Sequence, residues 1–380
     1  MFNIQEKNDR DNFSLSFIMA ILIFMPFYSE HKYIYASLFL LYVLMNLLFF
    51  KISFDKNDNK LLLAVLYSFI ISLFTYNFAV YHSSISWIIL SLFFICFNKT
   101  TDVKNLAILL VGISVFFSLD TILQFIYGED VLGNPLAFSG RATGPFMWTS
   151  PVIGNYIMAL FFVPEIIFKD YRIKIPIYIL FFIAIILAGT RGALIQVLFC
   201  LFFIYVNIKG KLFFLTLASI FCLFIAPIII PHIHNDGISR VLQLADVVNA
   251  FKYEARPDGR FVFWHDYLPG MIEHYGFIGS GLGGLEDYLS SVGASQIHPH
   301  HLYLELWLSF GVVGATLIIL YLRKLYLDGD NVSKLILLSF WGPFNALHSI
   351  FDFYWAIMLF INLSVVVIYN NHIKKGGNPR

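Results

Sequence analysis

The amino-acid sequence predicts an all-α polytopic membrane protein with about 12 transmembrane helices and one large outer loop that contains further helices. Hydrophobic residues make up 59% of its 380 residues and charged residues only 13%, whereas about 25% of a typical soluble domain is charged. Apolar runs long enough to cross about 30 Å of hydrocarbon recur along the chain. Because a helix satisfies its own backbone hydrogen bonds within the membrane, each run is expected to be a helix.

The expected spans form two series separated by one long polar stretch. They lie near 13–29, 33–50, 61–80, 84–97, 105–127, 151–168, 175–189, 192–207, 212–231, 302–322, 335–351 and 353–370. The fourth run is short and is expected to begin further upstream. The first run lacks a small-residue cleavage site and other spans follow it, so it is interpreted as a retained helix. Residues 1–380 are expected to form a single membrane domain, with 232–300 as an insertion between the ninth and tenth spans.

The basic residues predict the orientation of the spans, because Lys and Arg accumulate in cytoplasmic loops. With the N-terminus in the cytoplasm, 18 of the 25 Lys and Arg residues lie on the cytoplasmic side, and the C-terminus lies there too. The insertion then lies on the outer side. The three cysteines, Cys96, Cys200 and Cys222, fall inside expected spans, so no disulfide is expected on the outer side.

The outer side carries residue types suited to phosphate chemistry. Five of its seven basic residues are Arg, and ten of the 11 histidines lie on or near it. Arg presents a fixed fork of donors to phosphate, and His transfers protons near neutral pH. These residues indicate handling of a phosphorylated lipid at the outer leaflet, with interfacial residues of no chemical role as the alternative. The net charge of +1 argues against a nucleic-acid partner.

Two helices are expected in the first part of the insertion. Residues 237–253 carry an apolar stripe at helical spacing and are expected to lie along the membrane surface. A second helix begins near Arg260, with Asp258 as its N-cap. Arg260 and Trp264 are four residues apart and share a face, and Arg256 precedes the same N-terminus. Arg256 and Arg260 are therefore candidates for anion binding, with a surface salt bridge as the alternative for each.

Gly279, Gly281 and Gly284 satisfy the GxGxxG spacing of dinucleotide sites. No strand–helix–strand pattern surrounds them, and the segment lies on the outer side, so a dinucleotide site is not expected. The glycines instead predict a tight turn that brings backbone close to a substrate or to another loop.

The helix that follows the insertion begins beside a group of histidines, after Pro299 interrupts the preceding segment. One face at helical spacing consists of His300, Tyr303, Leu304 and Trp307. His300 would head this face, which points into the bundle, and is well placed to act as a general base. Two alternatives remain open: a metal site that His298 and Glu305 share with His300, and interfacial histidines without a chemical role.

Two further arginines lie at outer ends of spans. Arg191, in the segment GTRG, follows directly on one span and precedes the next. A charge so close to hydrocarbon is costly and favours a ligand-facing role, with extension to the headgroups as the alternative. Arg141 lies in a loop rich in Gly, Ser and Pro, where it contacts substrate or stabilises the loop. His348 and Asp352 are one turn apart and are interpreted as a structural pair.

Taken in order, these segments resemble the O-antigen ligase and polymerase superfamily of bacterial envelope polysaccharide enzymes. The family's His-Asn-x-Tyr-Leu segment reads His300-His301-Leu302-Tyr303-Leu304 here, with His301 in place of Asn, and a family-like GVVG follows at 311–314. The other similar segments surround Arg141, Arg191, Arg260 with Trp264, and Gly279 with Gly281. The similarity covers about half of the chain, from about residue 135 to about residue 320.

The resemblance implies a metal-independent glycosyltransferase without a cofactor, located in the bacterial inner membrane with a periplasmic active site. Its donor would be an undecaprenyl-diphosphate-linked glycan and its acceptor a lipid A-core oligosaccharide. Arg191 and Arg260, with Arg256 or Arg141, would bind the diphosphate leaving group. His300 would remove a proton from the acceptor hydroxyl, which attacks the anomeric carbon with inversion.

Two alternatives to a ligase remain open. A polymerase would extend one lipid-linked glycan with another, but the short chain, the single late loop and the His-x-x-Tyr-Leu segment look more like ligases. A transporter of lipid-linked glycans would need ionisable residues along a pathway through the spans. Its candidates are Asp120, Glu165 and Glu305, each expected nearer a helix end.

Overall fold

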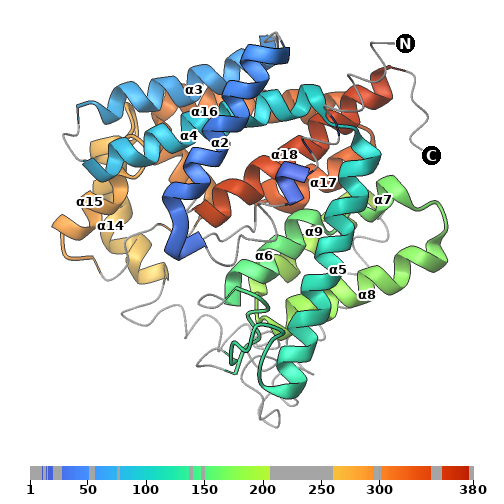
Figure 1. The fold of residues 1–380 in the computed structure, drawn as a ribbon. Helices are drawn as coiled ribbons and strands as arrows, with labels where there is room; N and C mark the ends of the chain where they lie inside the picture. The colour runs from blue at the N-terminus through green and yellow to red at the C-terminus, as the bar shows by residue number, and fades with distance from the viewer. Residues whose placement is uncertain are drawn as a thin grey trace. The chain divides into compact units, whose positions relative to one another are not determined.

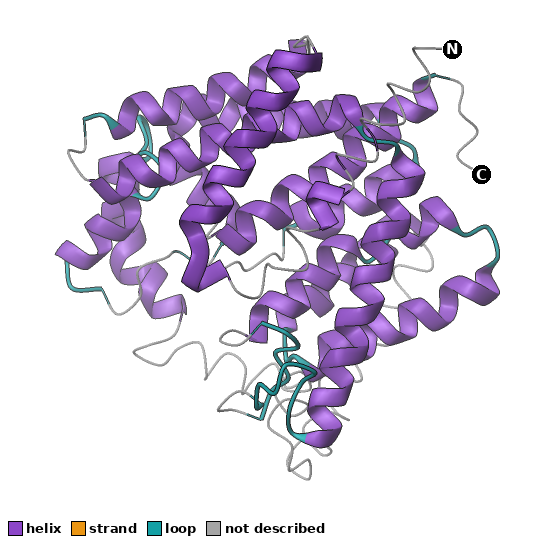
Figure 2. Ribbon diagram, in the orientation of Figure 1, coloured by secondary structure: helices purple, strands orange, loops and turns teal. Residues whose placement is uncertain are grey.

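The computed structural model is helical, with turns and loops between the helices (Figures 1 and 2). It describes residues 11, 14, 16–19, 28–50, 56–74, 78–136, 140–146, 150–205, 260–294, 299, 301–343 and 353–375. No strand occurs among these residues, in agreement with the predicted all-α class. Asp258, the apolar runs at 13–29 and 212–231 and the expected helix at 237–253 lie mostly or wholly outside them.

The chain divides into two compact units, each built from segments that are distant in sequence. The first consists of Met1–Asp102, Glu254–Gly329 and Ala346–His372; the second consists of Val103–Tyr253, Asp330–Asn345 and Ile373–Arg380. Helices of the first unit are α2 (Tyr28–Phe50), α3 (Lys56–Ser72), α4 (Phe78–Thr100), α14 (Arg260–Tyr275), α15 (Gly284–Ser291), α16 (Leu302–Asp328) and α18 (Phe353–Lys374). Those of the second are α5 (Val103–Tyr127), α6 (Ser150–Leu160), α7 (Pro164–Ile167), α8 (Tyr171–Leu187), α9 (Arg191–Tyr205) and α17 (Asn331–Trp341).

Three helices of the described chain are long and apolar enough to cross a membrane: Val103–Tyr127, Leu302–Asp328 and Trp355–Lys374. Four shorter apolar helices accompany them, at Ser37–Leu48, Ile85–Thr100, Val152–Ile167 and Arg191–Ile204. These helices confirm the membrane-protein class, while the number of about 12 spans stays a prediction. The expected upstream extension of the fourth run is confirmed, because α4 begins at Phe78.

The run expected at 151–168 is not one regular helix but α6 and α7 joined by a three-residue turn. Pro164 has no backbone N–H to donate to Leu160, which lies four residues earlier. The carbonyl of Leu160 instead accepts the N–H of Val163 at 3.0 Å, which tightens the chain into a turn. The tenth run, α16, also departs from expectation, because its backbone is non-helical at Gly311 (φ 61°, ψ −175°).

The break at Gly311 is closed by the turn that the GxGxxG glycines form. Ser280 N–H donates to Leu308 O at 2.8 Å, Gly281 N–H donates to Ser309 O at 3.1 Å, and Val312 N–H donates to Phe277 O at 3.0 Å. We call these residues, 277–281 and 308–312, the glycine clasp. The predicted tight turn with a close backbone approach is confirmed, but its neighbour is helix α16, not a substrate or another loop as expected.

Helix α3 supports the glycine clasp from a third direction. The hydroxyl of Tyr67 donates to Ile278 O at 3.0 Å, and the hydroxyl of Ser68 donates to Ser309 O at 3.4 Å. Helices α3 and α16 run side by side in Figure 1 and pack against each other. The clasp therefore joins the first spans of this unit to the segment that follows α14.

Gly279→Ala is expected to destabilise the protein strongly. Gly279 has φ 99°, and a methyl group there would lie 2.6 Å from Ser309 O and 2.7 Å from Gly311 N. Backbone strain at such a φ costs about 1–3 kcal/mol, and the clash within the glycine clasp adds to it. Thermal unfolding of the detergent-purified variants, followed by intrinsic fluorescence, should show a Tm several degrees below that of wild type.

Gly293→Ala is the matched control, because Gly293 has φ 68° but a methyl group there meets no atom within 4 Å. Its loss of Tm should reflect the backbone strain alone. Equal losses for the two variants would contradict the tight packing of the glycine clasp.

Candidate functional site

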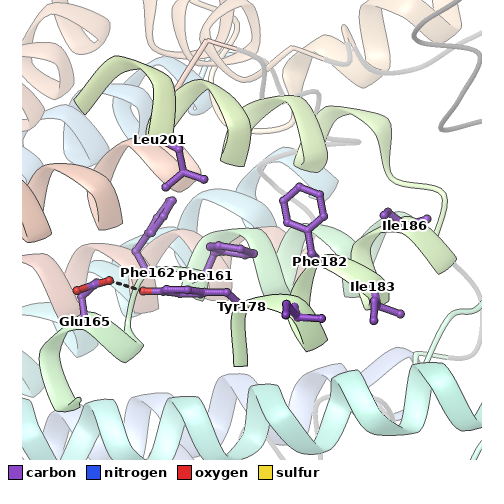
Figure 3. Close-up of a pocket in the computed structure, with 9 residues that line it drawn as sticks. Phe161, Phe162, Glu165, Tyr178, Phe182, Ile183, Ile186 and Leu201 are labelled. Atoms are coloured by element: carbon purple, nitrogen blue, oxygen red, sulfur yellow. Dashed lines mark hydrogen bonds between the residues drawn. The ribbon is translucent and has the colours of Figure 1, made fainter. Parts of the chain in front are cut away.

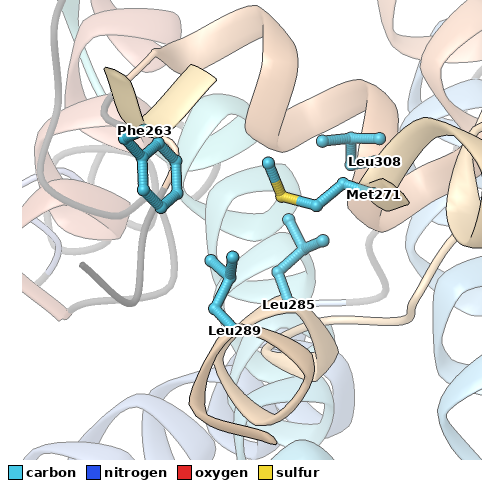
Figure 4. Close-up of a cluster of buried hydrophobic side chains, with 5 residues drawn as sticks. All are labelled: Phe263, Met271, Leu285, Leu289 and Leu308. Carbon is cyan, nitrogen blue, oxygen red and sulfur yellow. The ribbon is translucent and has the colours of Figure 1, made fainter. Parts of the chain in front are cut away.

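The helices around the expected catalytic segment share a small apolar core. Phe263 and Met271 from α14, Leu285 and Leu289 from α15, and Leu308 from α16 are all buried and pack together (Figure 4). Burial of such side chains stabilises by about 1.5–3 kcal/mol each. This core fixes α14, which begins at Arg260 as predicted, against the N-terminal half of α16.

A tryptophan from α14 holds the chain directly before the expected base. The indole N–H of Trp264 donates to the carbonyl of Pro299 at 2.9 Å. The same ring meets the ring of His301 edge to face, with centroids 6.1 Å apart. Arg260 lies one helical turn before Trp264, so the structure brings the Arg…Trp helix and the histidine segment together. His300 itself, like Arg256 and the side chain of Arg260, lies outside the described residues.

His301 has a structural role that the sequence did not reveal. It is the N-cap of α16, and its Nδ1 accepts the backbone N–H of Leu304 at 3.4 Å. Burial lowers the pKa of the imidazole below its usual value, because desolvation disfavours the charged form. A neutral ring keeps the lone pair that the cap requires, so His301 can act as an N-cap acceptor, a position at which Asn is also favoured.

A second tryptophan makes the reciprocal contact. Trp307 of α16 donates its indole N–H to the carbonyl of Gly276, just after α14, at 2.8 Å. Helix α14 thus bonds a carbonyl just before α16, and α16 bonds a carbonyl just after α14. The first bond fixes the residue before His300, and the second fixes the end of α14 against α16.

The second unit carries Arg191 and Arg141. Gly189 (φ 63°) turns the chain between α8 and α9, and Arg191 is the first residue of α9, so Arg191 lies between two helices as expected. The N–H of Ala142 donates to Leu187 O at 3.2 Å, which ties the residue after Arg141 to the end of α8. Both arginines are half-buried. The structure therefore gathers the two arginine segments at one end of α8 and α9.

Glu165 and Asp120, two of the ionisable residues considered for a transport pathway, are bonded to nearby residues. Glu165 accepts from Lys174 Nζ at 2.7 Å and from the Tyr178 hydroxyl at 2.7 Å. Asp120 accepts the backbone N–H of Val131 at 2.8 Å. Glu305 lies buried in the first turn of α16. Glu165 and Glu305 lie near helix ends, as expected.

The alternative metal site is not tested by the structure. Within the described ranges no group of three or more His, Cys, Asp or Glu side chains could hold a metal ion. His298 and His300, which the metal interpretation needs, are outside those ranges. His348 and Asp352, the expected structural pair, are outside them as well.

An apolar pocket of about 350 Å³ lies along α8 (Figure 3). Its walls are aromatic and aliphatic, and Glu165 with Tyr178 closes one end. Ile186, another lining residue, lies one residue before Leu187, the last residue of α8. The pocket is lined by Phe161, Phe162, Glu165, Tyr178, Ile179, Phe182, Ile183, Ile186 and Leu201.

Comparison with protein families finds a similarity in the middle of the chain. Residues 176–319 match the family described as O-antigen ligase. This match supports an assignment of the chain to the O-antigen ligase superfamily. The resemblance that the motifs carry is thereby confirmed, and the matched range contains Arg191, Arg256, Arg260 and His300 but not Arg141. No curated protein and no solved structure matches the chain.

The site also contains residues that the motifs did not predict. Helical spacing predicts neither the bond of Trp264 to Pro299 nor the bond of Trp307 to Gly276. A further residue that the motifs do not include is Gln124 in α5. A Gln within an otherwise apolar span is a detectable signal, because an amide in hydrocarbon must find hydrogen-bond partners.

Proposed function

We propose that this chain is an O-antigen ligase, which transfers a glycan from undecaprenyl diphosphate to a hydroxyl of the lipid A-core oligosaccharide at the periplasmic face of the bacterial inner membrane. The observation that carries the proposal is the superfamily match over residues 176–319. It includes the expected base and three of the four arginines in the order in which the sequence presents them. Both termini would then be cytoplasmic.

The proposed reaction is a displacement at the anomeric carbon of the donor sugar. His300 removes the proton of the acceptor hydroxyl, whose oxygen forms the new bond to the anomeric carbon with inversion. The bond between that carbon and the diphosphate oxygen breaks, and the diphosphate leaves with the electron pair. Because the lipid diphosphate already carries the activation, the reaction needs no metal, nucleotide or other cofactor.

The arginines would stabilise the negative charge that develops on the leaving group. Arg191 and Arg260, with Arg256 or Arg141, offer forked donors that fit diphosphate oxygens. The position of Arg191 at the first residue of α9 supports this role, because helix N-terminal amides also favour anions. The bond between Trp264 and Pro299 supports the role of His300, because it fixes the backbone of the preceding residue.

The apolar pocket along α8 would accommodate part of the hydrocarbon chain of the donor. Its lining is almost entirely aromatic and aliphatic, and it reaches Ile186, close to the turn that carries Arg191. From Tyr178 to Ile186, eight residues later, the helix rises by about 12 Å. An apolar chain in this pocket would end near the arginine that binds its diphosphate.

A transporter is disfavoured by the partners of Glu165. Its bonds to Lys174 and Tyr178 use both carboxylate oxygens, as in a structural ion pair. A polymerase of the same superfamily would use the same donor chemistry and differs from the ligase in its acceptor. The deciding experiment must therefore identify the acceptor.

Deletion of the gene, followed by gel analysis of lipopolysaccharide, tests the proposed function. Loss of polymer from lipid A together with accumulation of lipid-linked polymer is expected, because a ligase acts after the polymer is complete. Complementation with the wild-type gene should restore the polymer on lipid A. A core that carries one repeat unit would identify a polymerase instead.

His300→Ala is expected to abolish most of the transfer while the protein remains inserted and folded. Loss of a general base lowers the rate by about 10²–10⁴-fold. Transfer by the purified variant should be measured with a lipid-linked donor and a lipid A-core acceptor. His265→Ala is the control, because this imidazole on α14 is 88% exposed and pairs with Asp266. Full activity of His300→Ala would overturn the assignment of the base.

Arg191→Lys is expected to lose activity although the charge is kept. Lys cannot reproduce the forked pair of donors, and one lost hydrogen bond to a charged group costs about 1.5–3 kcal/mol, or a rate loss of about tenfold or more. The kcat/KM for the lipid-linked donor should be measured. Arg172→Lys is the control, since this exposed residue lies at the opposite end of α8. An unchanged rate for Arg191→Lys would indicate that Arg191 only extends to the headgroups.

A further inference from the structure

The loop that leads from α5 to Arg141 is held in a defined shape by its own backbone. Leu136 N–H donates to Gly128 O at 3.1 Å, and Asp130 N–H donates to Asn134 O at 2.9 Å. Four glycines with positive φ allow its turns: Gly128, Gly133, Gly140 and Gly144. A loop of this length next to a membrane span needs further anchors if one of its side chains is to be placed accurately.

Gln124 supplies the main anchor. Its side chain is fully buried in the last two turns of α5. The amide oxygen accepts the backbone N–H of Thr143 at 2.7 Å and of Gly144 at 2.9 Å. The amide nitrogen lies 3.1 Å from each of three acceptors: Asn134 O, Pro135 O and Thr143 Oγ1. The Gln124 side chain thus joins the part of the loop before Arg141, at Asn134 and Pro135, to the part after it, at Thr143 and Gly144.

Two further bonds complete the support of this loop. Asp120, one helical turn before Gln124, accepts the N–H of Val131 at 2.8 Å. On the other side of Arg141, the N–H of Ala142 donates to Leu187 O at the end of α8. Three consecutive backbone N–H groups after Arg141 are therefore bonded, one to α8 and two to Gln124. The position of Arg141 relative to the α8–α9 turn depends on these bonds.

We propose that Gln124 is a positioning residue that holds Arg141 beside the α8–α9 turn, where its guanidinium binds the diphosphate of the lipid-linked donor. The inference rests on the proposed function, since it takes the donor from there. Without the amide, the N–H groups of Thr143 and Gly144 would be buried and unbonded, which a low-dielectric surrounding penalises heavily. The loop segment that contains Thr143 and Gly144 would then move, and Arg141 would move with it.

A labelling experiment tests the positioning without reference to the reaction. In full-length protein with its native cysteines replaced by Ala, Arg141→Cys reports the exposure of this position to a membrane-impermeant maleimide. Adding Gln124→Met, which keeps the volume but not the amide, should change the labelling rate several-fold. Gln196→Met is the control, because Gln196 is an equally buried Gln in α9 whose amide donates to Leu338 O at 2.6 Å. An unchanged rate in folded Gln124→Met protein would overturn the proposal.

Kinetics test the role toward the donor. Gln124→Met should raise the KM for the lipid-linked donor by about tenfold, the loss of one hydrogen bond to a charged group, and change kcat less. Arg141→Ala should have a similar effect, and the double variant should be no worse than Arg141→Ala alone, because Gln124 acts through Arg141. Additive effects, or no effect of Arg141→Ala on KM, would overturn the assigned role.

The two experiments separate this proposal from the proposed function. If the gene deletion shows that the chain is not a ligase, the labelling result still decides whether Gln124 positions Arg141. If Gln124→Met fails to fold, Gln124→Glu keeps the oxygen that accepts from Thr143 and Gly144, and it should give a smaller change in labelling and in KM. If Gln124→Glu raised the KM for the donor as much as Arg141→Ala does, the importance assigned to the amide oxygen would be overturned.

Discussion

Backbone groups inside apolar helices must be hydrogen-bonded by the protein itself, and the architecture of this chain depends on that constraint. Gly311 interrupts α16 and would leave the carbonyls of Leu308 and Ser309 and the N–H of Val312 without helical partners. The glycine clasp satisfies all three. Glycine is required at position 279 because a Cβ atom there would clash with the backbone of Ser309 and Gly311 in α16. A break in a span is thus stabilised by a turn from the expected outer insertion.

The same constraint explains how the expected site segments are held. The carbonyls of Pro299 and Gly276 accept from two indoles, and the N–H groups of Thr143 and Gly144 both donate to the amide oxygen of Gln124. In each case a single side chain from a helix fixes a non-helical segment, and the segments held by Trp264 and Gln124 adjoin His300 and Arg141. These bonds couple stability to the site, since the loss of one partner leaves a buried polar group unsatisfied.

The sequence was sufficient to predict the features that depend on local composition. The apolar runs became α5 and α16 with nearly the expected bounds, and the helix starting at Arg260 follows from its spacing. The break at Gly311 could not be predicted, because the apolar pattern continues across it and its partners lie about 30 residues earlier. The role of Gln124 in fixing the loop could not be predicted either. Its hydrogen-bond partners lie 10 to 20 residues away, on a loop whose path is set by tertiary contacts.

The superfamily match and the supporting residues fall on different parts of the chain. Residues 176–319 contain Arg191, Arg260 and His300, but the hydroxyls that brace the glycine clasp belong to α3, and the amide that fixes the Arg141 loop belongs to α5. The residues before 130 lie outside the matched range, yet they supply these supports. Most residues to which the proposed function assigns a chemical role therefore lie in the matched segment, whereas polar side chains from the preceding helices hold neighbouring segments in place. Substitution of such a support should alter substrate binding without changing any residue of the motif.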